Sequence, residues 1–124
     1  MCIRDRLIAV TILTSLSQED LYQLGLDDLS HQVLKLANLS YECELDGVVC
    51  ASTDTAATKE RFGNEFITVT PGIRPNESNL NDQSRVSTPK QAIKNGSDYL
   101  VIGRPITGSN DPSEALKNIY KEIV

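Results

Sequence analysis

The strongest constraint on the fold is a regular alternation of short apolar runs with longer amphipathic segments. The apolar runs are L-I-A-V-T-I-L (7–13), D-G-V-V-C (46–50), F-I-T-V-T (66–70) and D-Y-L-V-I (98–102). Short, β-branched and continuously apolar runs are typical of strands buried on both faces. Strands that alternate with helices predict right-handed βαβ units and a parallel sheet.

The segments between these runs carry helix signals. Asp28 to Glu42 places apolar and small residues three and four positions apart, which predicts an amphipathic helix. Thr88-Pro89 combines a capping side chain with proline at the first helical position. The predicted helices span 28–42, 54–62, 88–95 and 111–123, and residues 17–24 are predicted to form a short helix or a turn. The pattern alone leaves a doubly wound sheet and a (β/α)8 barrel both open.

Composition excludes several classes of protein. The chain has 124 residues, enough for one domain, and its net charge of −5 with unclustered basic residues disfavours nucleic acid as a partner. No apolar run approaches the roughly 20 residues of a membrane span. The three cysteines are odd in number and lack C-x-x-C spacing, so we expect no disulfide or zinc site and a cytoplasmic location.

Two predicted strands end in arginine-bearing loops. The third runs into V-T-P-G-I-R-P-N-E-S-N-L-N-D-Q-S-R (69–85), and the fourth ends directly in Gly103-Arg104-Pro105. Barrels commonly hold phosphate in the loops after strands 7 and 8, and a complete barrel needs about 250 residues. The pattern therefore predicts an anion site in the C-terminal part, about strands 5 to 8, of a (β/α)8 TIM barrel with parallel strands.

Five segments, in order, resemble the bacterial type of the orotidine 5′-phosphate decarboxylase family. They are L-I-A-V-T-I-L-T-S (7–15), L-D-G-V-V-C (45–50), V-T-P-G-I-R-P (69–75), D-Q-S-R-V-S-T-P (82–89) and D-Y-L-V-I-G-R-P-I-T (98–107). The resemblance covers residues 7–124. Residues 1–6, M-C-I-R-D-R, match nothing that it implies, and we expect them to be a truncated or artefactual start.

The resemblance implies a TIM barrel that works as a homodimer and converts orotidine 5′-phosphate to UMP and CO2 without a cofactor. The family's catalytic array, D-x-K-x-x-D after the third barrel strand, is missing here. The lysines all fall on predicted helices: Lys35, Lys59, Lys90, Lys94, Lys117 and Lys121. We therefore expect no catalytic residue in this chain, and the chain alone to be inactive.

The resemblance also assigns substrate-binding residues. Arg104 corresponds to the phosphate arginine, whose planar fork binds two oxygens at once, and Gly103 lets the main chain approach the phosphate. Gln83 corresponds to the loop glutamine that bridges phosphate and base. The remaining positions are Arg74, as a ligand-contacting arginine, Thr14 on the pyrimidine side, and Pro71 as a possible neighbour of the base.

Other polar residues have simpler interpretations. Arg85 is expected to form a structural salt bridge rather than to bind ligand. Asp46 begins a strand, on the face of a barrel that contributes stability. His31 is expected on the surface of a charged helix, and Cys50 in the core.

Two further functions stay open at this point. One is a non-catalytic module that binds phosphate or a nucleotide. The other is a related sugar-phosphate barrel enzyme, such as a hexulose-phosphate synthase or a keto-gulonate phosphate decarboxylase. The long loop with Asp82-Gln83 favours the pyrimidine enzyme.

Overall fold

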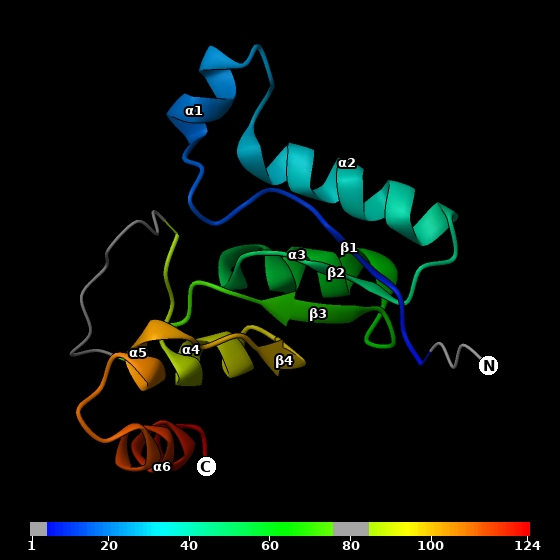
Figure 1. Cartoon of the computed structure of the whole chain (residues 1–124). Helices are drawn as coiled ribbons and strands as arrows, with labels where there is room; N and C mark the ends of the chain where they lie inside the picture. The colour runs from blue at the N-terminus through cyan, green and yellow to red at the C-terminus, as the bar shows by residue number, and fades with distance from the viewer. Residues whose placement is uncertain (1–4, 76–84) are drawn as a thin grey trace.

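A computed structural model describes residues 5–75 and 85–124, and Figure 1 shows their arrangement. The strands are β1 (Ile8–Val10), β2 (Gly47–Val49), β3 (Ile67–Thr70) and β4 (Tyr99–Leu100). They form one sheet in the order β1-β2-β3-β4, and every neighbouring pair is parallel. The predicted parallel α/β architecture is therefore confirmed, although each strand is shorter than the apolar run that predicted it.

The helices of the described ranges are α1 (Gln18–Gln23), α2 (Leu29–Glu42), α3 (Ser52–Phe62), α4 (Pro89–Lys94), α5 (Arg104–Thr107) and α6 (Pro112–Ile123). The side chains of Ser17, Asp28, Thr88 and Asp111 accept hydrogen bonds from backbone N–H groups in the first turns of α1, α2, α4 and α6. The first N–H groups of a helix have no acceptor within the helix, and these side chains supply one. For this reason the capping residues in the sequence predicted where the helices begin.

One predicted helix start was wrong, and one short helix was not predicted. Helix α3 was expected to begin at Asp54 but begins at Ser52, after an N-cap, Ala51, that makes no side-chain cap bond. Asp54 gave a misleading signal because its carboxylate pairs with Arg85 instead of capping a helix. Helix α5 was not predicted, because four residues are too few to show a helical period.

The core lies between the sheet and the helices on one side of it. The apolar cluster joins Val48 and Cys50 at the second strand to side chains of the flanking helices, and also contains Leu21, Leu29, Val33, Ala37 and Phe66. Helix α2 packs against β1, β2 and α3, and α4 packs against α3 and α6. A Cβ atom on Gly47 would lie 2.1 Å from the Ile67 carbonyl oxygen, so only glycine fits where β2 meets β3. Across the described residues, no helix is both long enough and apolar enough to cross a membrane.

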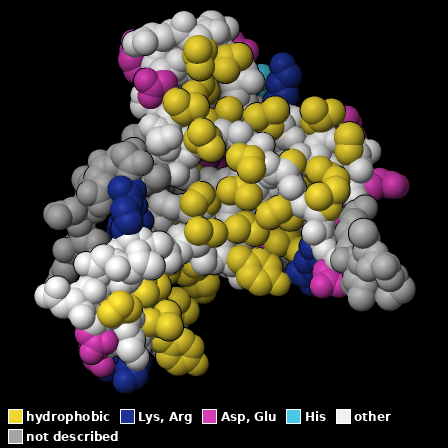
Figure 2. Space-filling view, viewed as in Figure 1, with side chains coloured by type: hydrophobic (Ala, Val, Ile, Leu, Met, Phe, Trp, Pro, Cys, Tyr) yellow, Lys and Arg dark blue, Asp and Glu magenta, His cyan; other side chains and the backbone are white. Residues whose placement is uncertain are grey.

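The opposite face of the sheet is largely apolar, although Arg6 Nη1 donates to the Tyr99 hydroxyl group there at 3.1 Å. The register aligns Val10 with Val49, Val49 with Val69, and Val69 with Tyr99. Side chains alternate between faces along a strand, so these four share the face turned away from Val48 and the core. Val10 is 59% exposed and Tyr99 52% exposed. Figure 2 shows hydrophobic side chains spread across the middle of the molecule in the same view.

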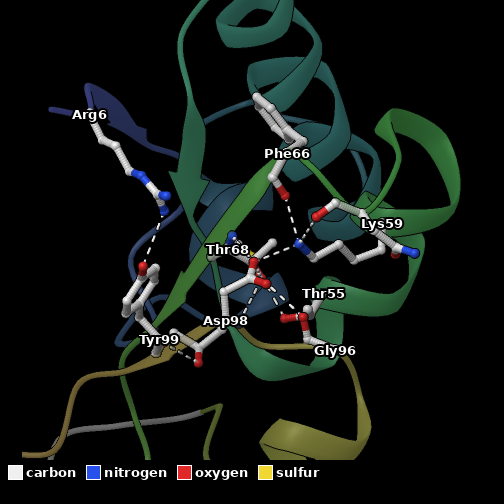
Figure 3. A network of polar contacts seen from close by, with 11 residues as sticks. Arg6, Thr55, Lys59, Phe66, Thr68, Gly96, Asp98 and Tyr99 are labelled. Carbon is white, nitrogen blue, oxygen red and sulfur yellow. Dashed lines mark hydrogen bonds and ion pairs between the residues drawn. The ribbon is translucent and has the colours of Figure 1, made fainter.

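A polar network joins the helix layer to the amino ends of β3 and β4 (Figure 3). The Lys59 ammonium donates to the Asp98 carboxylate at 2.5 Å and to the Phe66 carbonyl at 2.8 Å. Thr68 donates two hydrogen bonds to the same carboxylate. Its backbone N–H does so at 2.7 Å and its hydroxyl group at 3.1 Å. Asp98 immediately precedes β4, so this carboxylate fixes the start of β4 beside β3.

These bonds shift the titration of Asp98. Partial burial raises the pKa of the Asp98 carboxyl, but the hydrogen bonds from Lys59 and Thr68 outweigh it and hold the pKa below its ordinary value. A lowered pKa means that the carboxylate stabilises the fold fully above the unfolded-state pKa of about 3.9. That contribution disappears as the pH falls through the lower pKa of the folded state.

We expect Asp98→Asn to reduce the free energy of unfolding at pH 7 by about 1–2 kcal/mol, the lower part of the range for charged hydrogen bonds, because the site is partly solvent-screened. The variant should also lose less stability than the wild type between pH 5 and pH 3. Urea denaturation at pH 7, pH 5 and pH 3 measures both effects. Asp27→Asn, which removes an exposed carboxylate, is the matched control. Equal acid sensitivity of Asp98→Asn and wild type would contradict the assignment.

Candidate functional site

The candidate site lies at the carboxyl ends of the strands, where the loops predicted to bind an anion come together. Strands β3 and β4 are parallel neighbours, with Val69 beside Tyr99 and Thr70 beside Leu100. Their following loops therefore leave the same edge of the sheet, which is where ligands bind in open α/β sheets and barrels. The first loop carries Arg74 and the second carries Arg104.

Arg104 is the first residue of α5 and is exposed, directly after the N-cap Gly103. The Gly103 carbonyl accepts the N–H groups of Ile106 at 2.9 Å and Thr107 at 3.0 Å, which fixes the turn. A Cβ atom on Gly103 would meet no atom within 4 Å. Within the described ranges, the Gly103 backbone is therefore open on the side where a side chain would project.

Arg74 has a different environment. Its side chain is only 7% exposed, and Nη1 donates to the Ile73 carbonyl at 3.0 Å. Its Nε–H is buried and has no hydrogen-bond partner among the described residues. The backbone N–H of Arg74 donates to the Ser87 carbonyl at 2.9 Å, and Gly72 adopts a φ of 74° that favours glycine. A tight turn thus holds Arg74 below the surface, and Pro71, half-buried, follows β3 directly.

The remaining predicted residues are Thr14 and Gln83. Thr14 is 5% exposed and lies beyond the carboxyl end of β1. Its carbonyl accepts the backbone N–H of Arg85 at 3.2 Å, which brings the end of the long loop beside the β1 loop. Gln83 lies outside the described residues. The structure therefore places Thr14, Pro71, Arg74, Gly103 and Arg104 after the carboxyl ends of strands.

Arg85 connects three loops at this edge. Its Nη1 pairs with the Asp54 carboxylate at 2.5 Å, and its Nη2 donates to the carbonyls of Ile12 at 3.1 Å and Leu13 at 3.3 Å. The prediction of a structural salt bridge is confirmed. We call Arg85, Asp54 and the two carbonyls the Arg85 clamp, because it ties the β1 loop and the first turn of α3 to the loop that follows β3.

Sequence reasoning did not identify Asp54 as the partner. The available signal was its place as the acidic residue in the first turn of the helix after β2. Its side chain is 7% exposed. Burial raises the pKa of the Asp54 carboxyl above its ordinary value, and the charge and hydrogen bonds of Arg85 only partly oppose this. A buried carboxylate of this kind depends on its cationic partner.

The simpler interpretations of other residues hold. Asp46 accepts the backbone N–H of Leu7 at 2.5 Å and precedes β2, away from the candidate site. His31 is exposed on α2. Cys50 is fully buried, and burial raises the pKa of its thiol to about 11. Every lysine lies on a helix, as predicted. Within the described ranges, no cluster of three or more histidine, cysteine or acidic residues could hold a metal ion.

The architecture defines a class of protein: a parallel α/β sheet of the kind that forms (β/α)8 barrels, with its candidate site at the carboxyl ends of the strands. The model of one family, described as "Orotidine 5′-phosphate decarboxylase / HUMPS family", matches residues 4–119. This chain belongs to that family.

Its relatives are substantially longer. The chain is 49% identical to an orotidine 5′-phosphate decarboxylase of Nitrosomonas eutropha, over 98% of this chain and 53% of that protein. It is 53% identical to one of Psychromonas ingrahamii, over 95% of this chain and 51% of that protein. The chain thus spans about half the length of the curated relatives it matches.

Solved structures show the same proportion. The crystal structure of orotidine 5′-phosphate decarboxylase from Lactobacillus acidophilus matches with a TM-score of 0.77 and 38% identity, over 95% of this chain and 49% of the other. An uncharacterized conserved protein from Geobacillus kaustophilus matches with a TM-score of 0.76 and 36% identity, over 98% and 50%. The fold is therefore the C-terminal part of a barrel of this family, as predicted.

The Arg85 clamp generates a stability prediction. Arg85→Met should lower the free energy of unfolding at pH 7 by about 3–5 kcal/mol, because it leaves the Asp54 carboxylate buried without its partner. The loss should shrink near pH 4, since the raised pKa lets Asp54 become neutral there. Denaturant titrations at both pH values measure it.

The double variant Asp54→Asn/Arg85→Met is the control. It removes both charges and should be more stable at pH 7 than Arg85→Met alone. A double variant whose loss equals the sum of the two single losses would show that the pair is not coupled.

Proposed function

We propose that this chain is the substrate-holding part of an orotidine 5′-phosphate decarboxylase, which converts orotidine 5′-phosphate to UMP and CO2 in pyrimidine biosynthesis. The observation that carries the proposal is the position of Arg74 and Arg104 after the carboxyl ends of two adjacent parallel strands. Membership of the family, and relatives whose printed name is that of the decarboxylase, support it.

In this proposal, Arg104 and the Gly103 N–H hold the 5′-phosphate. Arg104 offers a planar pair of donors at an exposed helix start, and the space beside Gly103 is open. Gln83 bridges phosphate and base from the loop that ends at the Arg85 clamp. Thr14 contacts the pyrimidine, Pro71 borders it, and Arg74 contacts the ligand. Phosphate binding remote from the reacting carbon supplies energy for closing the loop and positioning the base.

The bond-breaking step needs groups from outside this chain. Loss of CO2 breaks the bond between C6 and its carboxylate and leaves an electron pair on C6, which must then take up a proton. An ammonium group held by carboxylates is suited to deliver that proton. The lysines of this chain all lie on helices, and Lys59 points its ammonium group to the amino ends of the strands. The chain alone is therefore proposed to be inactive.

The proposal extends to the intact enzyme. We place it in the cytoplasm as a homodimer that uses neither metal nor organic cofactor and does not bind nucleic acid or membranes. A sugar-phosphate substrate is the alternative within the family. The names of the curated relatives, at 48–53% identity, favour the pyrimidine nucleotide.

The phosphate assignment is tested in a complete barrel. The N-terminal part of the Nitrosomonas eutropha relative, joined ahead of residues 7–124, should decarboxylate orotidine 5′-phosphate. Arg104→Ala in this chimera should lose about 2–5 kcal/mol of transition-state stabilisation in kcat/KM, because the bound phosphate loses its charged partner. The kcat/KM of Arg104→Lys should fall between that of the unmodified chimera and that of Arg104→Ala. Lys94→Ala removes an exposed positive charge from α4 and is the control. Unchanged kinetics in Arg104→Ala would refute the phosphate role.

A second measurement separates this proposal from a self-sufficient nucleotide-binding module. Calorimetric titration of the 124-residue chain with UMP should give no saturable heat, since half of the binding cavity belongs to the rest of the barrel. Saturable binding that Arg104→Ala abolishes would instead favour the non-catalytic module.

A further inference from the structure

Three consecutive backbone carbonyls after β1 accept hydrogen bonds from one residue, Arg85. The backbone N–H of Thr11 still donates to β2, at 3.1 Å, and the chain then leaves the sheet. Arg85 Nη2 donates to the carbonyls of Ile12 at 3.1 Å and Leu13 at 3.3 Å. The backbone N–H of Arg85 donates to the carbonyl of Thr14 at 3.2 Å. Arg85 therefore sets the path of residues 12–14, between β1 and α1.

Arg85 is itself fixed from two other parts of the fold. Its Nη1 pairs at 2.5 Å with the carboxylate of Asp54, in the first turn of α3. Two residues after Arg85, the backbone N–H of Ser87 donates to the Gly72 carbonyl at 3.3 Å, in the turn that follows β3. A planar guanidinium group holds its donors in fixed directions, so it can bind a carboxylate and backbone carbonyls at the same time. The position of residues 12–14 is thus referred to a helix and to a second loop.

The contacts of Arg85 indicate that it acts on a ligand only through the residues it holds. Its side chain is 13% exposed, and both terminal nitrogens donate to acceptors of the protein. Of the three carbonyls, the last belongs to Thr14, the residue that contacts the pyrimidine in the proposed function. Thr14 is 5% exposed, so the place of its hydroxyl group depends on the backbone that Arg85 binds.

We propose that Arg85 is a positioning residue for the decarboxylation reaction. It holds the backbone of residues 12–14 where the Thr14 hydroxyl group can meet the base, and Asp54 directs the guanidinium group toward these carbonyls. The inference rests on the proposed function, which gives Thr14 its contact with the pyrimidine. A displacement of about 1 Å in a group that positions substrate can lower the rate about 100-fold. Loosening this segment should therefore slow the reaction although Arg85 does not touch the substrate.

Arg85→Lys in the chimera described above is the first test. Lysine keeps a positive charge beside Asp54 but lacks the planar fork that also reaches the carbonyls. We expect kcat/KM to fall about ten- to hundredfold while far-UV circular dichroism is unchanged. Arg61→Lys makes the same substitution at an exposed position of α3 and should leave kcat/KM unchanged. An unchanged kcat/KM in Arg85→Lys would overturn the inference.

A double-variant cycle separates positioning from a general loss of structure. Thr14→Val removes the hydroxyl group and keeps the size of the side chain. If Arg85 acts through that hydroxyl group, Arg85→Lys should cost much less once it is absent. The double variant should then have about the same kcat/KM as Thr14→Val alone. Losses that multiply would overturn the inference and would leave Arg85 a stabilising role only.

Arg104→Ala supplies the reference for independent sites. Its loss of kcat/KM should multiply with that of Arg85→Lys, because the phosphate contact does not pass through residues 12–14. Coupling to Arg104 as strong as the coupling to Thr14 would overturn the inference. A chimera that does not decarboxylate orotidine 5′-phosphate, or that is unaffected by Arg104→Ala, would refute the proposed function itself. An active chimera that is sensitive to Arg104→Ala but shows no coupling between Arg85 and Thr14 would refute only the positioning role.

A second variant keeps the test available if Arg85→Lys does not fold. Asp54→Asn/Arg85→Met removes both buried charges together and replaces Arg85→Lys in the same cycle. Its loss of kcat/KM should likewise shrink when Thr14→Val is present, and a loss of undiminished size would overturn the inference.

Discussion

The parallel direction of every strand is the constraint on which the other features depend. Because β3 and β4 run the same way, the loops that follow them leave one edge of the sheet, and Arg74 and Arg104 come to the same edge although thirty positions separate them. The amino ends meet at the opposite edge, where Lys59 and Asp98 join helix and sheet. The fold thus separates a stabilising edge from a candidate binding edge, a division common to parallel barrels.

Two ion pairs of similar length serve these edges differently. The Lys59–Asp98 pair is partly exposed, and its hydrogen bonds lower the pKa of the carboxyl. The Arg85–Asp54 pair is more deeply buried, and burial raises the pKa of its carboxyl. Raising the pH through the acid range therefore strengthens the first interaction while increasing the cost of keeping Asp54 charged. The distances in the two ion pairs alone, without the burial of each carboxyl group, would have predicted the same direction of pKa shift for Asp98 and Asp54.

Much of the fold could be predicted from local signals. Periodicity and capping residues such as Thr88 and Asp111 located helices because they act within one turn of the chain. What could not be predicted arises from contacts distant in sequence or from very short elements. Asp54 gave the signal of a helix start, but its partner lies 31 positions away. Helix α5 has no period to detect, and the burial of Arg74 follows from a turn and a bridge to Ser87.

The burial of Cys50 has a practical consequence. This thiol follows β2 directly, beneath the candidate binding edge. Its burial and its raised pKa both protect it from reagents in solution, whereas Cys43 is exposed. Alkylating reagents react with thiolate and must reach it, so modification of Cys50 requires the helix layer to separate from the strands. The rate at which Cys50 is labelled in native buffer would therefore measure how often this region opens transiently beneath the candidate binding edge.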